Sequence, residues 1–252
     1  MKIITSTENE TFKTLKSLVT AKGRAEHGLC LIEGTKILFE NLEHVVDVFV
    51  REGTPVTPNL ADFEPVVLAK KLFDEISDLD TPCGIIATAL IPPNATRITW
   101  PALVLDRIGD PGNMGTLIRT AVAFGFKSII AINCAGMFSQ KVIRSAMGQQ
   151  FKIENFVVVS SDNFFNNTIK SLEAQLLIAD MGGRDFGNFN AEGDIALVLG
   201  SEGEGVDKRF FDRPHTVLSI PMQNKVESLN VAVAGGILMH QLGQGGMNGR
   251  SQ

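Results

Sequence analysis

The sequence is poor in the residues from which several kinds of site are built. It has no tyrosine and one tryptophan, Trp100, which disfavours a platform of aromatic side chains that stacks RNA bases. Its three cysteines, Cys30, Cys83 and Cys134, form no CxxC motif, and its four histidines lack metal-ligand spacing. No apolar run approaches the length of a membrane span, and the N-terminus turns polar at once. We therefore expect a cytoplasmic protein with neither disulfides nor a metal.

The composition is that of a globular protein, but its charge is unevenly distributed. The 252 residues are 44% hydrophobic and 20% charged, and the formal net charge is −5. Residues 97–152 nevertheless carry +5, whereas residues 1–36 carry +2, residues 37–96 carry −7 and residues 153–252 carry −5. Cations concentrated in one block can bind a polyanion even when the whole protein is acidic. A solvated surface is the plainer explanation.

The first 90 residues have the pattern of a small α/β domain. Apolar residues at helical spacing occur over residues 6–20, and helical stretches follow near 34–43 and 70–78. Short apolar runs typical of strands lie between them, at residues 29–32, 45–50, 66–68 and 84–90. The segment IPPNATRITWP at residues 91–101 contains three prolines, so we place a linker there.

Residues 102–252 have the pattern of a parallel α/β domain. Runs rich in Val, Ile and Leu recur, with helical patterns between most of them, at residues 102–106, 128–132, 156–160, 176–180, 194–200 and 216–220. Such runs are typical of parallel strands that are covered on both faces. Ligands of these sheets bind in loops beyond the carboxyl ends of the strands, so the candidate sites are the loops that follow.

The first candidate loop, DRIGDPGNMGTLIRTAVAFG, spans residues 106–125. It predicts a turn followed by a helix, with Asn113 as a plausible N-cap and Arg119 near the second turn of that helix. The alternative is a tight strand-to-helix turn with an exposed arginine and no function.

The second candidate loop, LGSEGEGV at residues 199–206, is rich in glycine and acidic. Its glycines fall as GxxGxG, which is neither the dinucleotide motif nor a Walker A loop. Because its two carboxylates would repel a phosphate, we expect a neutral or cationic ligand held by backbone groups. The alternative is an acidic turn that caps a helix near residues 204–212.

The third candidate loop, IPMQNKVESLNVAVAGGILMHQ at residues 220–241, ends in a helix dense in small residues. Ser228 and Asn230 lie at the start of this helix, where capping alone would explain them. The stripe of Val231, Ala234, Gly235 and Leu238 indicates a core or a dimer face.

Together, DPGNMGTLIRTAVAFG, LVLGSEGEGV and LSIPMQNKVESLNVAVAGG closely resemble the three motifs of the SpoU/TrmH family of RNA ribose 2′-O-methyltransferases, within the SPOUT superfamily. The segment IEGTKILFENL at residues 32–42 resembles the small substrate-binding domain of members that act on ribosomal RNA. The resemblance implies S-adenosylmethionine as methyl donor, a homodimer, and a C-terminal trefoil knot that involves residues 194–242, an exception to the rule that chains do not thread.

The resemblance also implies roles for particular residues. Those expected to contact the cofactor are Gly200, Ile220, Met222 and Leu229. Those expected to organise the loops or to lie near the transferring methyl are Glu202, Ser228, Asn113, Asn230 and Arg119. Arg144, in KVIRSAMG, matches a position associated with RNA contact. From the charge of the first 36 residues we add the candidate RNA-binding residues Lys13, Lys16, Lys22 and Arg24.

These roles must be chemically sensible. A guanidinium is rarely deprotonated in proteins, so we expect Arg119 to stabilise the developing alkoxide and not to act as a base. We expect residues 1–90 to choose the RNA, and a chain that starts near Ile91 to fold alone. Transfer RNA as substrate and a catalytically silent RNA-binding protein of the same fold are the alternatives. A Rossmann-type nucleotide enzyme is disfavoured by the missing GxGxxG.

Overall fold

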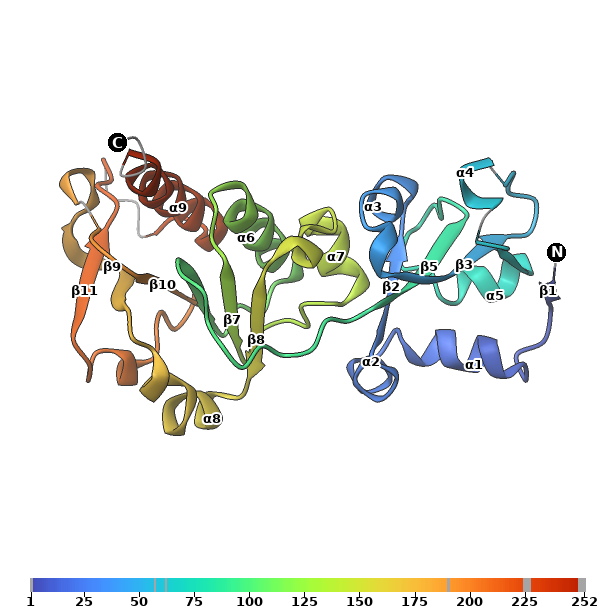
Figure 1. The fold of residues 1–252 in the computed structure, drawn as a ribbon, viewed down its shortest axis with the longest axis horizontal. Helices are drawn as coiled ribbons and strands as arrows, with labels where there is room; N and C mark the ends of the chain where they lie inside the picture. Colours follow the sequence, from blue (N-terminus) through green and yellow to red (C-terminus); the bar gives the residue numbers. More distant parts are fainter. Residues whose placement is uncertain (1, 57, 62, 190, 224–227, 249–252) are drawn as a thin grey trace. The chain divides into compact units, whose positions relative to one another are not determined.

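The chain forms two compact units (Figure 1). The computed structural model describes residues 2–56, 58–61, 63–189, 191–223 and 228–248. Unit 1 comprises Met1–Pro93 and Phe138–Phe151, and unit 2 comprises Asn94–Met137 and Lys152–Gln252. The chain therefore passes between the units at three places, after residues 93, 137 and 151, and not through a single linker.

Unit 1 is built on a mixed five-stranded sheet with the order β1-β4-β3-β5-β2. Strands β1, β4 and β3 pair in parallel, and β5 pairs antiparallel with both β3 and β2. Its strands are β1 (Ile3–Ile4), β2 (Leu29–Glu33), β3 (Val45–Arg51), β4 (Val66–Leu68) and β5 (Ile85–Leu90). Its helices are α1 (Glu10–Ser17), α2 (Ala21–His27), α3 (Thr35–Phe39), η1 (Leu42–His44), α4 (Pro58–Ala61), α5 (Lys70–Asp74) and α7 (Gln140–Ala146). The predicted small α/β domain ahead of the parallel sheet is confirmed.

Helix α7 packs within unit 1, although we expected residues 102–252 to form one domain. It contacts β2, and Gln140 Nε2 donates a hydrogen bond to the carbonyl of Ile76 at 3.1 Å. Arg144 forms an ion pair with Asp78. Burial of the apolar side of α7 against unit 1, which an amphipathic pattern does not specify in advance, explains the difference.

Unit 2 is built on a parallel six-stranded sheet with the order β11-β9-β10-β6-β7-β8. Its strands are β6 (Ala102–Asp106), β7 (Ser128–Ile132), β8 (Asn155–Val159), β9 (Gln175–Asp185), β10 (Ile195–Gly200) and β11 (His215–Ser219). Its helices are α6 (Pro111–Ala123), η2 (Gln149–Lys152, which crosses the unit boundary), α8 (Ser161–Asn166), η3 (Thr168–Ser171), η4 (Phe186–Asn188), η5 (Lys208–Phe210) and α9 (Val231–Asn248). The predicted parallel sheet is confirmed.

Helices cover both faces of this sheet, as its uninterrupted apolar strands require. On one face α6 and α9 lie side by side, and α8 lies on the other (Figure 1). Gly235 allows the close approach of α9, because a Cβ there would lie 2.4 Å from Leu117 Cδ2 and 2.7 Å from Leu199 Cδ1. On the opposite face Phe164 and Phe210 pack into a cluster with Val104 and its neighbours. The small-residue stripe of α9 therefore includes core positions.

Two local predictions are wrong. Asp110, not Asn113, is the N-cap of α6, because its carboxylate accepts a hydrogen bond from the Asn113 backbone N–H at 2.8 Å and Pro111 takes the first helical position. The helix expected near residues 204–212 is reduced to the 3₁₀ turn η5, in which Asp207 accepts a hydrogen bond from the Arg209 N–H at 3.0 Å.

The cysteines are free thiols, and the two more buried ones are poor nucleophiles. Burial raises the pKa of Cys30 to about 12 and that of Cys134 to about 11. Among the described residues, no helix combines the length and the apolar character needed to cross a membrane. The same part of the chain contains no group of three or more His, Cys, Asp or Glu side chains placed to hold a metal ion.

From the sequence we expected a chain that starts near Ile91 to fold alone. The packing of α7 against unit 1 predicts instead that one segment of such a chain loses its structure. A chain that starts at Ile91 would leave the segment Phe138–Phe151 without most of unit 1, and would expose Val142 and Ile143, which are buried in the whole chain. We expect rapid amide hydrogen exchange across this segment, with β6 still protected. Exchange followed by mass spectrometry on both proteins checks this, and equal protection of α7 in the two would contradict it.

Candidate active site

Three loops meet at the carboxyl edge of the sheet in unit 2. In the strand register Asp106, at the end of β6, lies beside Gly200, at the end of β10. The loop after β11 leads into α9, which packs against both α6 and β10. The three candidate loops of the sequence therefore emerge next to one another, where parallel α/β sheets place their ligands.

One carboxylate oxygen links all three loops. Glu202 Oε1 accepts hydrogen bonds from Asn113 Nδ2 at 3.2 Å, from Asn230 Nδ2 at 2.7 Å and from the Val231 backbone N–H at 3.3 Å. Asn230 Nδ2 also donates to Asn113 Oδ1 at 3.0 Å. Asn230 caps α9, because its Oδ1 accepts from the N–H groups of Ala232 and Val233 at 3.0 and 3.3 Å. We call Asn113, Glu202 and Asn230 the carboxylate–amide cluster.

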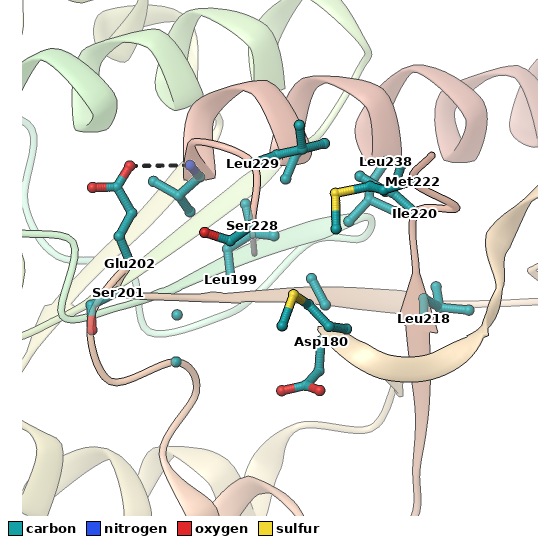
Figure 2. Close-up of a pocket in the computed structure, with 16 residues that line it drawn as sticks. Asp180, Leu199, Ser201, Glu202, Leu218, Ile220, Met222, Ser228, Leu229 and Leu238 are labelled. Carbon is teal, nitrogen blue, oxygen red and sulfur yellow. Dashed lines mark hydrogen bonds between the residues drawn. The ribbon is translucent and has the colours of Figure 1, made fainter. Parts of the chain in front are cut away.

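A pocket adjoins this cluster (Figure 2). Its apolar wall comes mainly from β10, β11, the loop after β11 and α9, and its polar wall from the second loop and the middle of β9. All four residues expected to contact the cofactor line it, namely Gly200, Ile220, Met222 and Leu229. So do Glu202 and Ser228, which were expected to organise the loops.

The chemistry of the lining fits S-adenosylmethionine. Leu218, Ile220 and Leu238 offer apolar surface of the kind that an adenine ring can stack on. The carboxylates of Asp180 and Glu202 lie in the same lining, which contains no Lys, Arg or His among the described residues. Such a pocket favours a ligand with a positive centre, such as a sulfonium, and disfavours a phosphate.

Gly200 is required where the second loop begins. A Cβ at this position would lie 2.2 Å from the backbone carbon of Gly205 and 2.4 Å from the backbone nitrogen of Val206. Ser201 and Gly205 form an antiparallel bridge directly beyond it. Because only glycine permits this close approach of the backbone, a larger residue would displace the wall of the pocket.

Arg119 does not join the cluster within one chain. It is exposed on α6 and lies outside the pocket lining, and its guanidinium has no hydrogen bond or ion pair to another of the described residues. Six residues separate it from Asn113, which turns its side chain by about 120° around the helix. The structure therefore brings Asn113, Glu202 and Asn230 together. Ser228 lines the adjoining pocket, and Arg119 lies on another face of α6.

The candidate RNA-binding cations of unit 1 differ in their availability. Lys13 lies 3.1 Å from both Glu8 and Glu10, Lys16 lies 2.7 Å from Glu75, and Lys22 is exposed. Arg144 is paired with Asp78. All of these ion pairs have at least one partly exposed partner and are worth little individually, so a phosphate can compete for the cations.

Arg24 is the exception, because the structure buries this candidate RNA-binding cation and gives its guanidinium partners within the chain. The residue is 9% exposed, and its guanidinium donates hydrogen bonds to the carbonyls of Leu18 and Val19 at 3.0 and 2.9 Å. Burial lowers the pKa of this guanidinium from its ordinary value. Arg24 therefore stabilises the turn after α1 and is not a surface cation.

Sequence reasoning missed two residues of the site. Asp180, at the end of the apolar part of β9, lines the pocket, and its Oδ1 accepts a hydrogen bond from the Gly182 N–H at 2.9 Å. Its position as the last residue of the strand predicted at residues 176–180 was the available signal. Arg107, directly after β6, holds Asp106 and the second loop, and no motif marks it.

A parallel sheet with a pocket built from three loops at its carboxyl edge defines an α/β ligand-binding domain, and comparison with known proteins identifies which one. The model of the SpoU rRNA Methylase family matches residues 101–240, and that of the MRM3-like substrate binding domain matches residues 9–87. The chain belongs to the SpoU rRNA methylase family.

The similarity to known proteins extends over almost the whole chain. It is 31% identical over 248 residues to the 23S rRNA (guanosine(2553)-2′-O)-methyltransferase RlmP of Bacillus subtilis, covering 96% of this chain and 99% of that protein. A putative RNA methyltransferase of the TrmH family from Porphyromonas gingivalis has a TM-score of 0.77 at 27% identity, covering 94% and 98% of the two chains. The AdoMet-bound rRNA methyltransferase from Sinorhizobium meliloti has the same fold, with a TM-score of 0.82 at 22% identity and 96% and 97% coverage.

The burial of Arg24 makes a prediction that separates stability from RNA binding. Arg24→Ala removes two hydrogen bonds from a charged donor and should lower the free energy of unfolding by about 2 kcal/mol. Its RNA affinity should be unchanged at temperatures where the variant is folded, whereas Lys22→Ala should leave stability unchanged and weaken RNA binding. Thermal unfolding and filter binding on both variants check this; weaker RNA binding by a fully folded Arg24→Ala protein would restore the surface role.

Proposed function

We propose that this protein transfers the methyl group of S-adenosylmethionine to a ribose 2′-hydroxyl of ribosomal RNA. The observation that carries the proposal is the convergence of the three family motifs on Glu202, beside an apolar pocket whose polar groups suit a cation. Ribosomal RNA is favoured over transfer RNA because the likeness to RlmP includes the N-terminal substrate-binding domain. The likeness to a bacterial enzyme of ribosomal RNA supports a cytoplasmic location for this protein.

The residues of unit 2 divide the work of the reaction. Ile220, Met222, Leu229 and Gly200 hold the cofactor through apolar surface and backbone groups. When bound, S-adenosylmethionine supplies an electrophilic methyl on a sulfonium. The carboxylate–amide cluster fixes the loops around it, so that the ribose hydroxyl and the methyl meet in a preset geometry.

Arg119 has a separate role on the RNA side. Its guanidinium cannot act as a base near neutral pH, because a guanidinium stays protonated in proteins. It donates hydrogen bonds to the ribose oxygen while that oxygen gains the methyl group and releases its proton to solvent water, and to a neighbouring phosphate. Its exposure and the absence of a partner among the described residues leave it available for these contacts.

We propose that the site is completed by a second copy of the chain. A shallow groove between α6 and α9 is lined by Phe124, Gly236, Val233 and Ile237, and the last two are 51% and 42% exposed. Asn113 and Asn230 also line this groove, so it adjoins the carboxylate–amide cluster. A partner seated here could bring its own Arg119 to the site. The trefoil knot over residues 194–242 stays a prediction.

The catalytic proposal is tested through Arg119. Purified protein should bind S-adenosylmethionine after treatment with a chelator and should methylate ribosomal RNA from cells that lack the gene. Arg119→Ala should slow single-turnover methyl transfer by about 100–1000-fold, the usual effect of removing one preorganised donor, and leave cofactor affinity unchanged. Arg119→Lys keeps the charge and serves as the matched variant. Near-normal rates in both variants would refute the role, and a wild-type protein that binds RNA without methylating it would favour the silent alternative.

The dimer proposal is tested on the exposed residues of α9. Ile237→Glu should convert a dimer into a monomer in light scattering, whereas the control Val19→Glu, at a comparably exposed site of unit 1, should not. Mixed dimers then locate the arginine. A chain with Arg119→Ala paired with a chain carrying Gly200→Val should recover about half of one dimer's activity if Arg119 acts across the interface, and almost none if it acts within its own chain. A wild-type monomer that is fully active would refute the proposal.

A further inference from the structure

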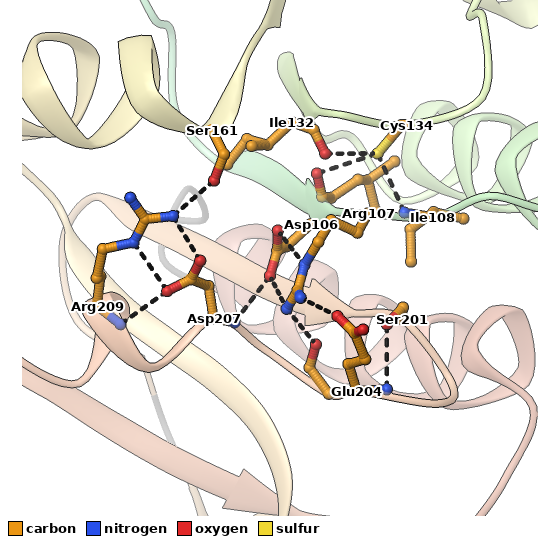
Figure 3. Close-up of polar contacts among 12 residues, drawn as sticks. Asp106, Arg107, Ile108, Ile132, Cys134, Ser161, Ser201, Glu204, Asp207 and Arg209 are labelled. Atoms are coloured by element: carbon orange, nitrogen blue, oxygen red, sulfur yellow. Dashed lines mark hydrogen bonds and ion pairs between the residues drawn. The ribbon is translucent and has the colours of Figure 1, made fainter.

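The side chain of Arg107 joins the end of β6 to the second loop, residues 199–206, through several polar contacts (Figure 3). Its Nε and Nη2 donate to the two carboxylate oxygens of Asp106 at 3.1 and 3.0 Å. Nη2 also donates to the carbonyl of Gly205 at 3.1 Å, and Nη1 pairs with Glu204. Asp106 is fully buried, and its Oδ2 accepts a further hydrogen bond from the Asp207 N–H at 2.8 Å. A single guanidinium thus fastens the end of β6 to the end of the loop.

The loop in question is short, and its residues form one wall of the cofactor pocket. Ser201 accepts hydrogen bonds from the N–H groups of Glu204, at 3.3 Å through its Oγ, and Gly205, at 2.9 Å through its carbonyl. Gly200, Ser201, Glu202 and Gly205 all line the pocket. The loop is held on one side by the carboxylate–amide cluster and on the other by Arg107.

The backbone at Arg107 is strained, and its side chain offsets the strain. Its φ is 59°, in the left-handed region that costs free energy for residues other than glycine. A glycine would relax the backbone but would remove every contact of the guanidinium. Hydrogen bonds to Asp106 also hold the pKa of Arg107 above its ordinary value, so its charge is constant. Strain of this kind persists where surrounding contacts require it.

We infer that Arg107 is a positioning residue that fixes the second loop and thereby sets the affinity for S-adenosylmethionine. This inference rests on the proposed function. It adds to that function a residue that lies outside the three segments that resemble the family motifs. Arg107 does not line the pocket, so it acts through the positions of Gly205 and its neighbours. The rival explanation is that Arg107 only neutralises the buried charge of Asp106.

The variant that separates these explanations is Arg107→Gly, because glycine suits the positive φ and the loss is confined to the side chain. We expect calorimetric titration of the full chain with S-adenosylhomocysteine to show about tenfold weaker binding, which is about 1.4 kcal/mol. In methyl transfer, the KM for S-adenosylmethionine should rise by a similar factor, with kcat at saturating cofactor changed less than threefold. Arg107→Lys should recover part of the affinity through its remaining charge.

Arg209 supplies a matched control for general loss of stability. It donates to Asp207 at 2.7 and 3.0 Å and to Ser161 at 2.8 Å, and it lies 4.0 Å from the ring centre of Phe165, without a contact to residues 201–205 among those described. Arg209→Ala should lower the unfolding temperature and leave the affinity for S-adenosylhomocysteine within twofold of the wild type. If both variants lose affinity in proportion to their stability, Arg107 has a structural role only and the inference is wrong.

Two further variants keep the test decisive if Arg107→Gly folds poorly. Asp106→Asn combined with Arg107→Gly removes the unpaired buried charge, and this double variant should still bind about tenfold more weakly. Glu204→Gln breaks only an ion pair whose acid is 72% exposed and should change affinity less than threefold. Wild-type affinity in the double variant would overturn the role of Arg107 alone, whereas a wild-type protein that fails to bind would overturn the proposed function and this inference together.

Discussion

A single carboxylate oxygen, Glu202 Oε1, is the contact on which the geometry of the site depends. It receives donors from the first turn of α6 and from the start of α9, while Glu202 itself belongs to the loop after β10. The negative charge lies at the N-terminus of an 18-residue helix, where the helix dipole favours it. Hydrogen bonds to a charged acceptor are roughly twice as strong as neutral ones, so one side chain holds three loops that are distant in sequence.

The sheet and most of the pocket could be predicted from the sequence for one physical reason. Strands that are buried on both faces must be continuous apolar runs, so β6 and β7 were predicted with their observed bounds. Parallel pairing then places their loops at a common edge. The positions of Gly200, Ile220, Met222 and Leu229 in the pocket lining follow from that edge and from the family motifs.

Predictions that depended on a particular tertiary partner were less successful. Asn113 and Asp110 are both good N-caps, and the choice was made by Pro111, which fits the first helical position. Arg24 has the pattern of a surface cation, but the carbonyl groups at the end of α1 take its guanidinium. Arg107 has two decisive partners. One is the buried carboxylate of Asp106, its neighbour in sequence, and the other is the carbonyl of Gly205, in a loop almost 100 residues away. Residue type and spacing do not contain this information.

The cations of this acidic protein fall into two groups, those that are paired with carboxylates and those that are not. Lys13, Lys16 and Arg144 are paired with carboxylates, and exposed pairs of this kind are worth about 0–1 kcal/mol, so an RNA phosphate can displace the acid at little cost. Such exchangeable contacts position a nucleic acid without specifying its sequence. Arg119 has no competing acid among the described residues and lies outside its own pocket, so no carboxylate of the described chain has to be displaced before its side chain meets the proposed substrate. In the function that we propose, recognition is built from exchangeable pairs, whereas the chemistry depends on a cation that is left unpaired.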